Sequence, residues 1–125
     1  LEAQALPNIQ FLGHVSDTER TYLMSKAQSV VVAALEDYGL VPVEANASGT
    51  PVIAYGAGGV LDTQIPGQTG LLFQRQSPDS LLAALLKSSQ MSWDYRKIRE
   101  HALNQFSEPV FFNRVEQVIE QACAM

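Results

Sequence analysis

The stretch from Val30 to Glu44 constrains the fold more than any other part of the chain. It opens with six apolar residues, 30 to 35, of which three are valine, and continues through Glu36, Gly39 and Pro42. Such a run predicts a strand covered on both faces, as in a parallel sheet. Gly39 allows a tight turn, and Pro42 is tolerated in a first helical turn because its missing N–H would have no partner there. The stretch therefore predicts a strand, a turn and a helix in succession.

The rest of the chain alternates between strand and helix patterns. Strands that alternate with helices predict an α/β domain with a Rossmann-like parallel sheet flanked by helices. We expect one domain over residues 1–125, with a helical tail from about residue 77. The expected strands are 8–13, 29–35, 51–55 and 70–73, and the expected helices begin after Ser16, near Leu40, near Leu61, at Pro78, near Tyr95 and before Phe111.

Local signals mark where several of these helices start and stop. Ser16 and Glu19 have the spacing of a capping box. Ser77 followed by Pro78 predicts a helix start, and Gly49 predicts a helix end. Apolar residues at three- and four-residue spacing predict the buried helix faces. These are Tyr22, Leu23 and Ala27; Leu81, Leu82, Leu85 and Leu86; Tyr95, Ile98 and Ala102; and Phe111, Val115, Val118, Ile119 and Ala122.

Two carboxylates flank the predicted turn, eight positions apart. Glu36 stands where the apolar run stops, and Glu44 lies early in the following helix. Ligands of open parallel sheets bind outside the carboxyl ends of the strands, and free N–H groups at a helix start favour anions. A carboxylate accepts hydrogen bonds from sugar and ribose hydroxyls. The pattern indicates a ligand with phosphates in its middle and hydroxyls at both ends, although a solvated strand-end acid and a helix-start acid would look the same.

The segment from Glu36 to Glu44 resembles the Glu-x7-Glu signature of the retaining nucleotide-sugar glycosyltransferases of group 1, family 4 type. One such pair is weak evidence, but five motifs of this family stand in register here. The other four are the segments 11–16 (FLGHVS), 44–54 (EANASGTPVIA), 58–59 (GG) and 67–71 (GQTGL), within a match from about residue 8 to 86. Two positions depart from the family pattern, because Asp37-Tyr38 replaces the usual Gly-Phe and Asp62 replaces a glutamate.

The resemblance implies the C-terminal, donor-binding domain of a GT-B glycosyltransferase. The parent protein would be a retaining hexosyltransferase that moves a sugar from a UDP- or GDP-sugar to a saccharide or lipid-linked acceptor, in polysaccharide or glycoconjugate biosynthesis. This chain alone would be incomplete and inactive. In the family, the acceptor contacts lie in an N-terminal GT-B domain, and the basic residues that clamp the diphosphate lie upstream on the first strand.

The resemblance also implies roles for individual residues. Glu36 is the candidate catalytic residue, because it would orient the transferred sugar, and Glu44 would hold the ribose. Glycines 56, 58 and 59 could cradle a phosphate or the sugar, or form a plain loop, and both interpretations stay open. The remaining candidate donor-binding residues are Tyr38, Gly39, Leu40, Val41, His14, Val15, Asp17, Gly58 and Gly59, with Arg20 as a further candidate.

Other kinds of chemistry find little support. The chain has no Asp-x-Asp, no Cys/His cluster with zinc spacing and no G-x-S-x-G. We therefore expect a metal-independent reaction without a cofactor, in which the nucleoside-diphosphate sugar is a substrate. Two alternatives stay open: another GT-B enzyme such as a nucleotide-sugar epimerase or a phosphorylase, and a flavodoxin-like non-catalytic binding module.

The charge pattern limits the classes of partner that the chain is expected to bind. The net charge is −5, and no Lys or Arg occurs from Ala27 to Gln74, which argues against nucleic acid. No apolar run approaches the roughly 20 residues of a membrane span. The single Cys123 agrees with a reducing compartment. We expect a cytoplasmic location, and the resemblance leaves open a peripheral association of the parent with the inner face of the membrane.

Overall fold

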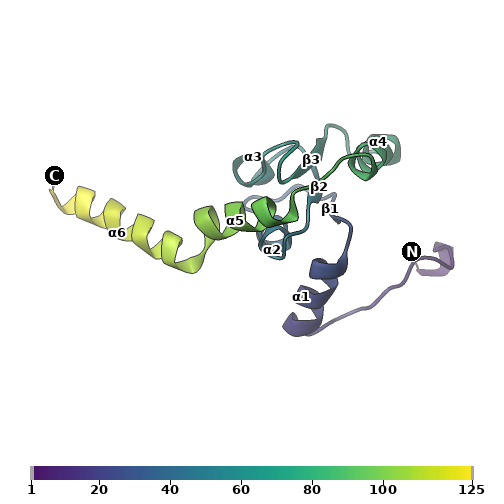
Figure 1. The fold of residues 1–125 in the computed structure, drawn as a ribbon, viewed down its shortest axis with the longest axis horizontal. Coiled ribbons are helices and arrows are strands. Elements are labelled where there is room, and N and C mark those ends of the chain that lie inside the picture. Colours follow the sequence, from purple (N-terminus) through teal and green to yellow (C-terminus); the bar gives the residue numbers. More distant parts are fainter. Residues whose placement is uncertain (1, 125) are drawn as a thin grey trace.

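The computed structural model describes residues 2–124, which form a three-stranded parallel sheet flanked by helices (Figure 1). The strands β1 (Val30–Val32), β2 (Val52–Tyr55) and β3 (Gly70–Phe73) lie side by side in that order. The predicted α/β class and parallel sheet are confirmed. The helices are η1 (Glu2–Gln4), α1 (Asp17–Lys26), α2 (Leu40–Ala47), α3 (Val60–Thr63), α4 (Pro78–Ser89), α5 (Tyr95–Phe106) and α6 (Glu108–Ala124).

Helices cover both faces of the sheet because side chains alternate along each strand. On one face, Ala45 of α2 packs with the core residues Val32, Val52 and Ala54. On the other face, Ala84 of α4 packs with Ile53, Leu71 and Phe73. Figure 1 shows α2 and α4 on opposite sides of the strands. Helix α5 then packs on α2 and buries Ile98 and Ala102.

The helix ends that the sequence marks most strongly are confirmed. Ser77 accepts a hydrogen bond from the Ser80 N–H, and Pro78 opens α4. Gly49 follows α2 with φ +83°, a left-handed conformation that glycine adopts without steric cost. Ser16 and Glu19 form the predicted capping box at the start of α1.

A buried polar network ties α2 to the loop before β3. The Asn46 amide donates to the carbonyls of Thr50 (3.0 Å) and Thr69 (3.1 Å) and accepts from Gln64 Nε2 (2.8 Å). The Thr69 hydroxyl donates to Gln64 Oε1 at 2.9 Å. Each of these polar groups has its partner inside the protein, as burial requires. The network lies where β2 and β3 begin, at the amino ends of these strands, whereas Glu36 lies beyond the carboxyl end of β1.

Among residues 2–124, no strand pairs with the outer edge of β1, and one face of this strand is uncovered. The Val30 N–H donates to the Pro51 carbonyl, so the peptide groups of Val31 face away from β2. The Val31 side chain is 45% exposed, because α4 covers β2 and β3 but not β1. The sequence predicted a strand buried on both faces over 29–35, and the structure has a shorter strand that is half covered.

The predicted strand at 8–13 is wrong. This segment has no strand partner among residues 2–124, and Figure 1 shows it extending away from the sheet. Its alternation of Ile9 and Phe11 is a genuine strand pattern, but a strand also needs a neighbouring backbone.

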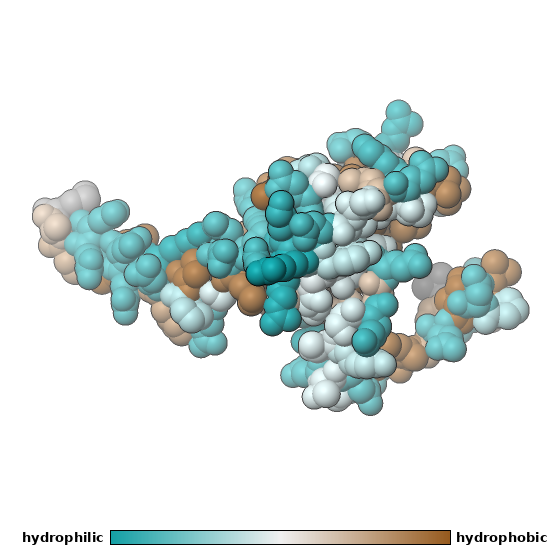
Figure 2. All heavy atoms as spheres, viewed as in Figure 1, coloured by the Kyte–Doolittle hydropathy of each residue, from teal (hydrophilic) through white to brown (hydrophobic). Residues whose placement is uncertain are grey.

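Several predicted core residues are also exposed. Tyr22 and Leu23 of α1, Leu82 and Leu86 of α4, Tyr95 of α5 and the apolar face of α6 are open to solvent. Figure 2 shows hydrophobic residues on the surface of both projecting ends of the chain. No helix within residues 2–124 combines the length and apolar character needed to cross a membrane.

Candidate functional site

Glu36 is held by its backbone at the carboxyl end of the sheet. Beyond β1 and β2 the two chains stay paired through a bridge between Glu36 and Gly58. The Gly59 N–H donates to the Glu36 carbonyl at 2.7 Å. The side chain of Glu36 remains exposed. The loop thus fixes the main chain of the predicted catalytic residue and leaves its carboxylate free to meet a ligand.

Gly58 and Gly59 are needed for this close approach. A Cβ atom at Gly58 would collide with the carbonyl oxygen of Glu36, and one at Gly59 would collide with that of Tyr38. Both clashes are with backbone, which cannot turn aside as a flexible side chain can. The glycine loop therefore has a structural role in holding Glu36, separate from any contact with a phosphate or sugar.

The start of α2 offers backbone N–H groups beside Glu36. Gly39 precedes the helix with φ +83°, and no side chain caps this end. The first N–H groups of a helix have no partner within it, so those of Leu40 and Val41 stay available. The Leu40 and Val41 side chains and Tyr38 are exposed around them. This arrangement can bind an anion, as the sequence predicted.

Glu44 points to a different place, the junction of α1 and α2. Its Oε2 lies 3.5 Å from Arg20 Nε, and Arg20 Nη2 lies 3.4 Å from Asp17 Oδ1. Two predicted donor-binding residues, Asp17 and Glu44, thus meet at one guanidinium. Glu44, Arg20 and Arg99 line a cavity of about 450 Å³ between α1, α2 and α5.

His14 and Val15 belong to the segment that leads into α1. His14 is exposed, and residues 8–13, which precede it, do not join the sheet that positions Glu36. Val15 is half-buried and lines an apolar hollow of about 440 Å³ with Leu12, Tyr22 and Leu23. The predicted residues therefore divide into three groups: the Glu36 loop with the start of α2, the Asp17–Glu44 junction, and the hollow at Val15.

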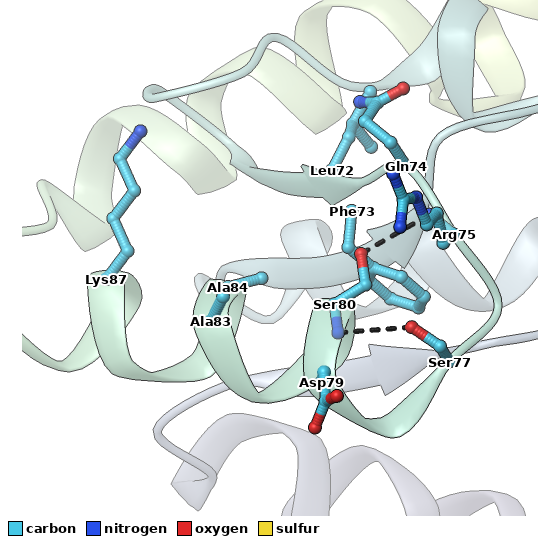
Figure 3. Close-up of a pocket in the computed structure, with 10 residues that line it drawn as sticks. All are labelled: Leu72, Phe73, Gln74, Arg75, Ser77, Asp79, Ser80, Ala83, Ala84 and Lys87. Carbon is cyan, nitrogen blue, oxygen red and sulfur yellow. Dashed lines mark hydrogen bonds between the residues drawn. The ribbon is translucent and has the colours of Figure 1, made fainter.

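A larger cavity of about 680 Å³ lies elsewhere, between β3 and α4 (Figure 3). Figure 3 shows Arg75 and Lys87 well apart along this groove, with Asp79 and Ser80 on the helix. None of the predicted site residues lines it. We place the candidate site at Glu36 and α2 instead, because that region combines an exposed carboxylate on a fixed main chain with free backbone donors.

Sequence reasoning missed two contacts around the site. Gln76, after β3, donates from Nε2 to the Ala33 carbonyl at 3.1 Å and ties that loop to the end of β1. The Arg20–Glu44 pair joins residues 24 positions apart, and no sequence motif contains both. Within residues 2–124, no group of three or more His, Cys, Asp or Glu side chains is arranged to hold a metal ion.

Comparison with known proteins decides the family. Residues 1–105 match the family model described as "Glycosyl transferases group 1". The chain belongs to this glycosyltransferase family. The prediction that it is the C-terminal domain of a GT-B glycosyltransferase is confirmed.

Individual relatives agree with this assignment. The chain is 36% identical over 77 residues to a glycogen synthase of Mycobacterium tuberculosis, covering 61% of this chain and 19% of that protein. It is 28% identical over 116 residues to an alpha-1,3/1,6-mannosyltransferase of Rhizomucor pusillus, covering 89% and 25%. The structure of sucrose-phosphate synthase from Thermosynechococcus elongatus superposes with a TM-score of 0.78 at 31% identity, covering 92% of this chain and 30% of that one. This glycosyltransferase chain thus spans 19% to 30% of the length of these relatives.

Proposed function

We propose that the parent protein is a retaining hexosyltransferase, and that this chain supplies most of its donor site. The donor would be a UDP- or GDP-sugar, and the acceptor a saccharide or a lipid-linked sugar bound by a second, N-terminal GT-B domain. The product would enter polysaccharide or glycoconjugate synthesis. The family assignment favours this proposal over the flavodoxin-like binding module that the sequence alone left open.

One observation carries the proposal. The family match coincides with a carboxylate, Glu36, whose backbone is fixed beside the uncapped start of α2. A fixed acid can orient sugar hydroxyls, and the neighbouring N–H groups of Leu40 and Val41 can bind the diphosphate. No protein nucleophile is needed for this reaction.

The bond changes balance without a covalent intermediate on the protein. The anomeric carbon–oxygen bond to the diphosphate breaks, and the acceptor oxygen bonds to the same face of the carbon. The acceptor proton passes to the departing phosphate oxygen. Helix α2 would stabilise the charge that develops on this leaving group. Because no Lys or Arg occurs from Ala27 to Gln74, the remaining charge would be met by basic residues outside this chain.

The other predicted residues complete the donor site. Glu44 would accept hydrogen bonds from the ribose, and the apolar hollow at Val15 suits a flat base. His14 and Asp17 are the neighbours of Val15 in sequence that would add polar contacts to the donor. Gly58 and Gly59 would shape the wall near the sugar while holding Glu36.

Replacing Glu36 tests the assignment in the parent protein. We expect Glu36→Ala to lower kcat about 10²–10³-fold, the size of effect seen when one transition-state contact is lost. The melting temperature should stay within about 1 °C of wild type, because an exposed strand-end acid contributes little to the core. Glu44→Ala should instead raise KM for the donor, because ribose contacts are made alike in the ground and transition states. Wild-type turnover in Glu36→Ala would refute the assignment, and NMR of the product's anomeric proton tests retention.

Metal removal provides a second test. We propose that protein donors, not a cation, stabilise the leaving diphosphate. Activity of the parent in excess chelator should therefore stay close to its value without chelator. A loss of activity that manganese or magnesium restores would contradict this part of the proposal.

A further inference from the structure

Arg20 makes the one ion pair that joins two different elements within residues 2–124. Its Nε lies 3.5 Å from Glu44 Oε2 on α2, while its Nη2 lies 3.4 Å from Asp17 Oδ1 on α1. The remaining ion pairs of this part of the chain link neighbours three or four positions apart. A guanidinium that bridges two acids from separate helices is well suited to fix their relative position.

Stability alone does not account for this pair. The Arg20 and Glu44 side chains are 46% and 41% exposed, and exposed ion pairs contribute little to folding. The contact does restrict where the Glu44 carboxylate lies, because Arg20 Nε stands 3.5 Å from its Oε2. An unpaired glutamate samples several rotamers, and holding one of them in advance reduces the cost of binding a ligand.

The surroundings leave one oxygen of Glu44 free for a ligand. Arg20 approaches Oε2, and no described residue donates a hydrogen bond to Oε1. The nearby hydroxyls are already used locally: Ser48 donates to the Glu44 carbonyl at 3.1 Å, and Ser25 donates to the Tyr22 carbonyl at 2.7 Å. A ligand hydroxyl thus meets little competition from these side chains for the free oxygen.

We infer that Arg20 is a positioning residue of the donor site, which holds Glu44 by one oxygen so that the other accepts a ribose hydroxyl. The inference rests on the proposed role of Glu44. It also assigns Arg20 a role other than clamping phosphate, because its guanidinium is already engaged by Asp17 and Glu44. Loss of Arg20 should weaken recognition of ribose hydroxyls while leaving diphosphate binding by α2 intact.

The cavity offers a matched control. Arg99 of α5 lines the same cavity, and it forms no ion pair with any residue in the 2–124 range. Arg20→Met and Arg99→Met each remove one positive charge from this place. Only the first removes the contact to Glu44.

The experiment measures nucleotide binding to the full-length parent by calorimetry. The probes are UDP, GDP or ADP, whichever binds most tightly, and its 2′-deoxy and 3′-deoxy counterparts. In wild type we expect removal of the recognised hydroxyl to weaken binding about tenfold or more, the loss of one hydrogen bond to a charged group. Glu44→Ala should abolish this preference for the ribonucleotide over its deoxy counterpart, and Arg20→Met should reduce the preference roughly three- to tenfold. Arg99→Met should retain it, and Arg20→Lys should restore part of it.

The outcomes separate the inference from the proposal beneath it. If Glu44→Ala still prefers the ribonucleotide over its deoxy counterpart as strongly as wild type does, the ribose role of Glu44 is wrong and the inference about Arg20 is wrong too. If Glu44→Ala loses this preference but Arg20→Met keeps it, only the inference is overturned. Equal effects of Arg20→Met and Arg99→Met, or equal weakening of ribo- and deoxynucleotides by Arg20→Met, would show a general charge or folding effect and also overturn it. Melting curves of each variant check that the protein stays folded.

Discussion

The block from Gly39 to Phe106 buries many of its apolar residues, whereas the two ends of the chain, residues 2–29 and 108–124, bury none of theirs. The block contains nearly all of the buried residues, including Val52, Ile53 and Ala54 of β2, which are fully covered. Residues 2–29 and 108–124 contain no buried residue, although both carry strong apolar patterns. Amphipathic periodicity therefore shows which face of an element is able to be buried, and burial then depends on whether a partner lies within reach.

The strongest test of this comparison uses two isoleucines on helices. Ile98 of α5 is 1% exposed, and Ile119 of α6 is 55% exposed. We expect Ile98→Ala to lower the free energy of unfolding of the 125-residue chain by about 2–5 kcal/mol, because it leaves a cavity against α2. Ile119→Ala should change it by no more than about 0.5 kcal/mol. Urea denaturation measures both, and equal effects would break the distinction between block and ends.

A smaller effect is expected from the polar network of the block. Asn46→Ala removes an amide that makes three hydrogen bonds and leaves Gln64 and two carbonyls without that partner. The cost should be about 1–3 kcal/mol. Asn104, an exposed asparagine on α5, is the matched control, and Asn104→Ala should stay within about 0.5 kcal/mol. A neutral Asn46→Ala would mean that water or rearrangement satisfies the network equally well.

The smallest effect compares two helix caps of the same chemistry. Ser77 and Ser16 each accept a hydrogen bond from the N–H of the third residue of a helix, but α4 has buried residues and α1 has none. Ser77→Ala should lower global stability by about 1 kcal/mol. Ser16→Ala should leave global unfolding unchanged and raise amide hydrogen exchange within α1 about fivefold, because α1 opens locally. A global loss with Ser16→Ala would place α1 inside the cooperative block.

The same division explains what the sequence could predict. The start of α4 at Ser77-Pro78, the end of α2 at Gly49 and the strand Gly70–Phe73 follow from local chemistry, and all three are confirmed. The strand at 8–13 depended on a neighbour, and the pattern could not show that residues 2–124 provide none. In α4, the larger Leu82 and Leu86 are exposed while Ala84 is buried, because Ala84 faces the sheet.

In the candidate site, too, the sequence could predict the features that depend on local signals but not the contacts between distant parts of the chain. The placement of Glu36 and the free start of α2 followed from a strand, a glycine turn and a helix in order, which are local signals. The Gly59–Tyr38 approach and the Arg20–Glu44 pair connect distant parts of the chain, and one sequence contains no direct signal for such contacts. The roles of the site residues remain predictions that the kinetic and binding experiments test.

The open edge of β1 has a consequence for anyone who purifies this chain. Of its three valines, Val31 turns its peptide groups to that edge, away from β2, and its side chain is exposed beside them. An uncovered, apolar edge strand is a template on which another molecule's strand can add, and natural proteins usually protect it with charge, proline or a covering element. No Lys or Arg between Ala27 and Gln74 serves as such a guard. Self-association through β1 is therefore an aggregation hazard of the isolated chain, and a longer form of the protein that covers this edge is the better material for biochemical work.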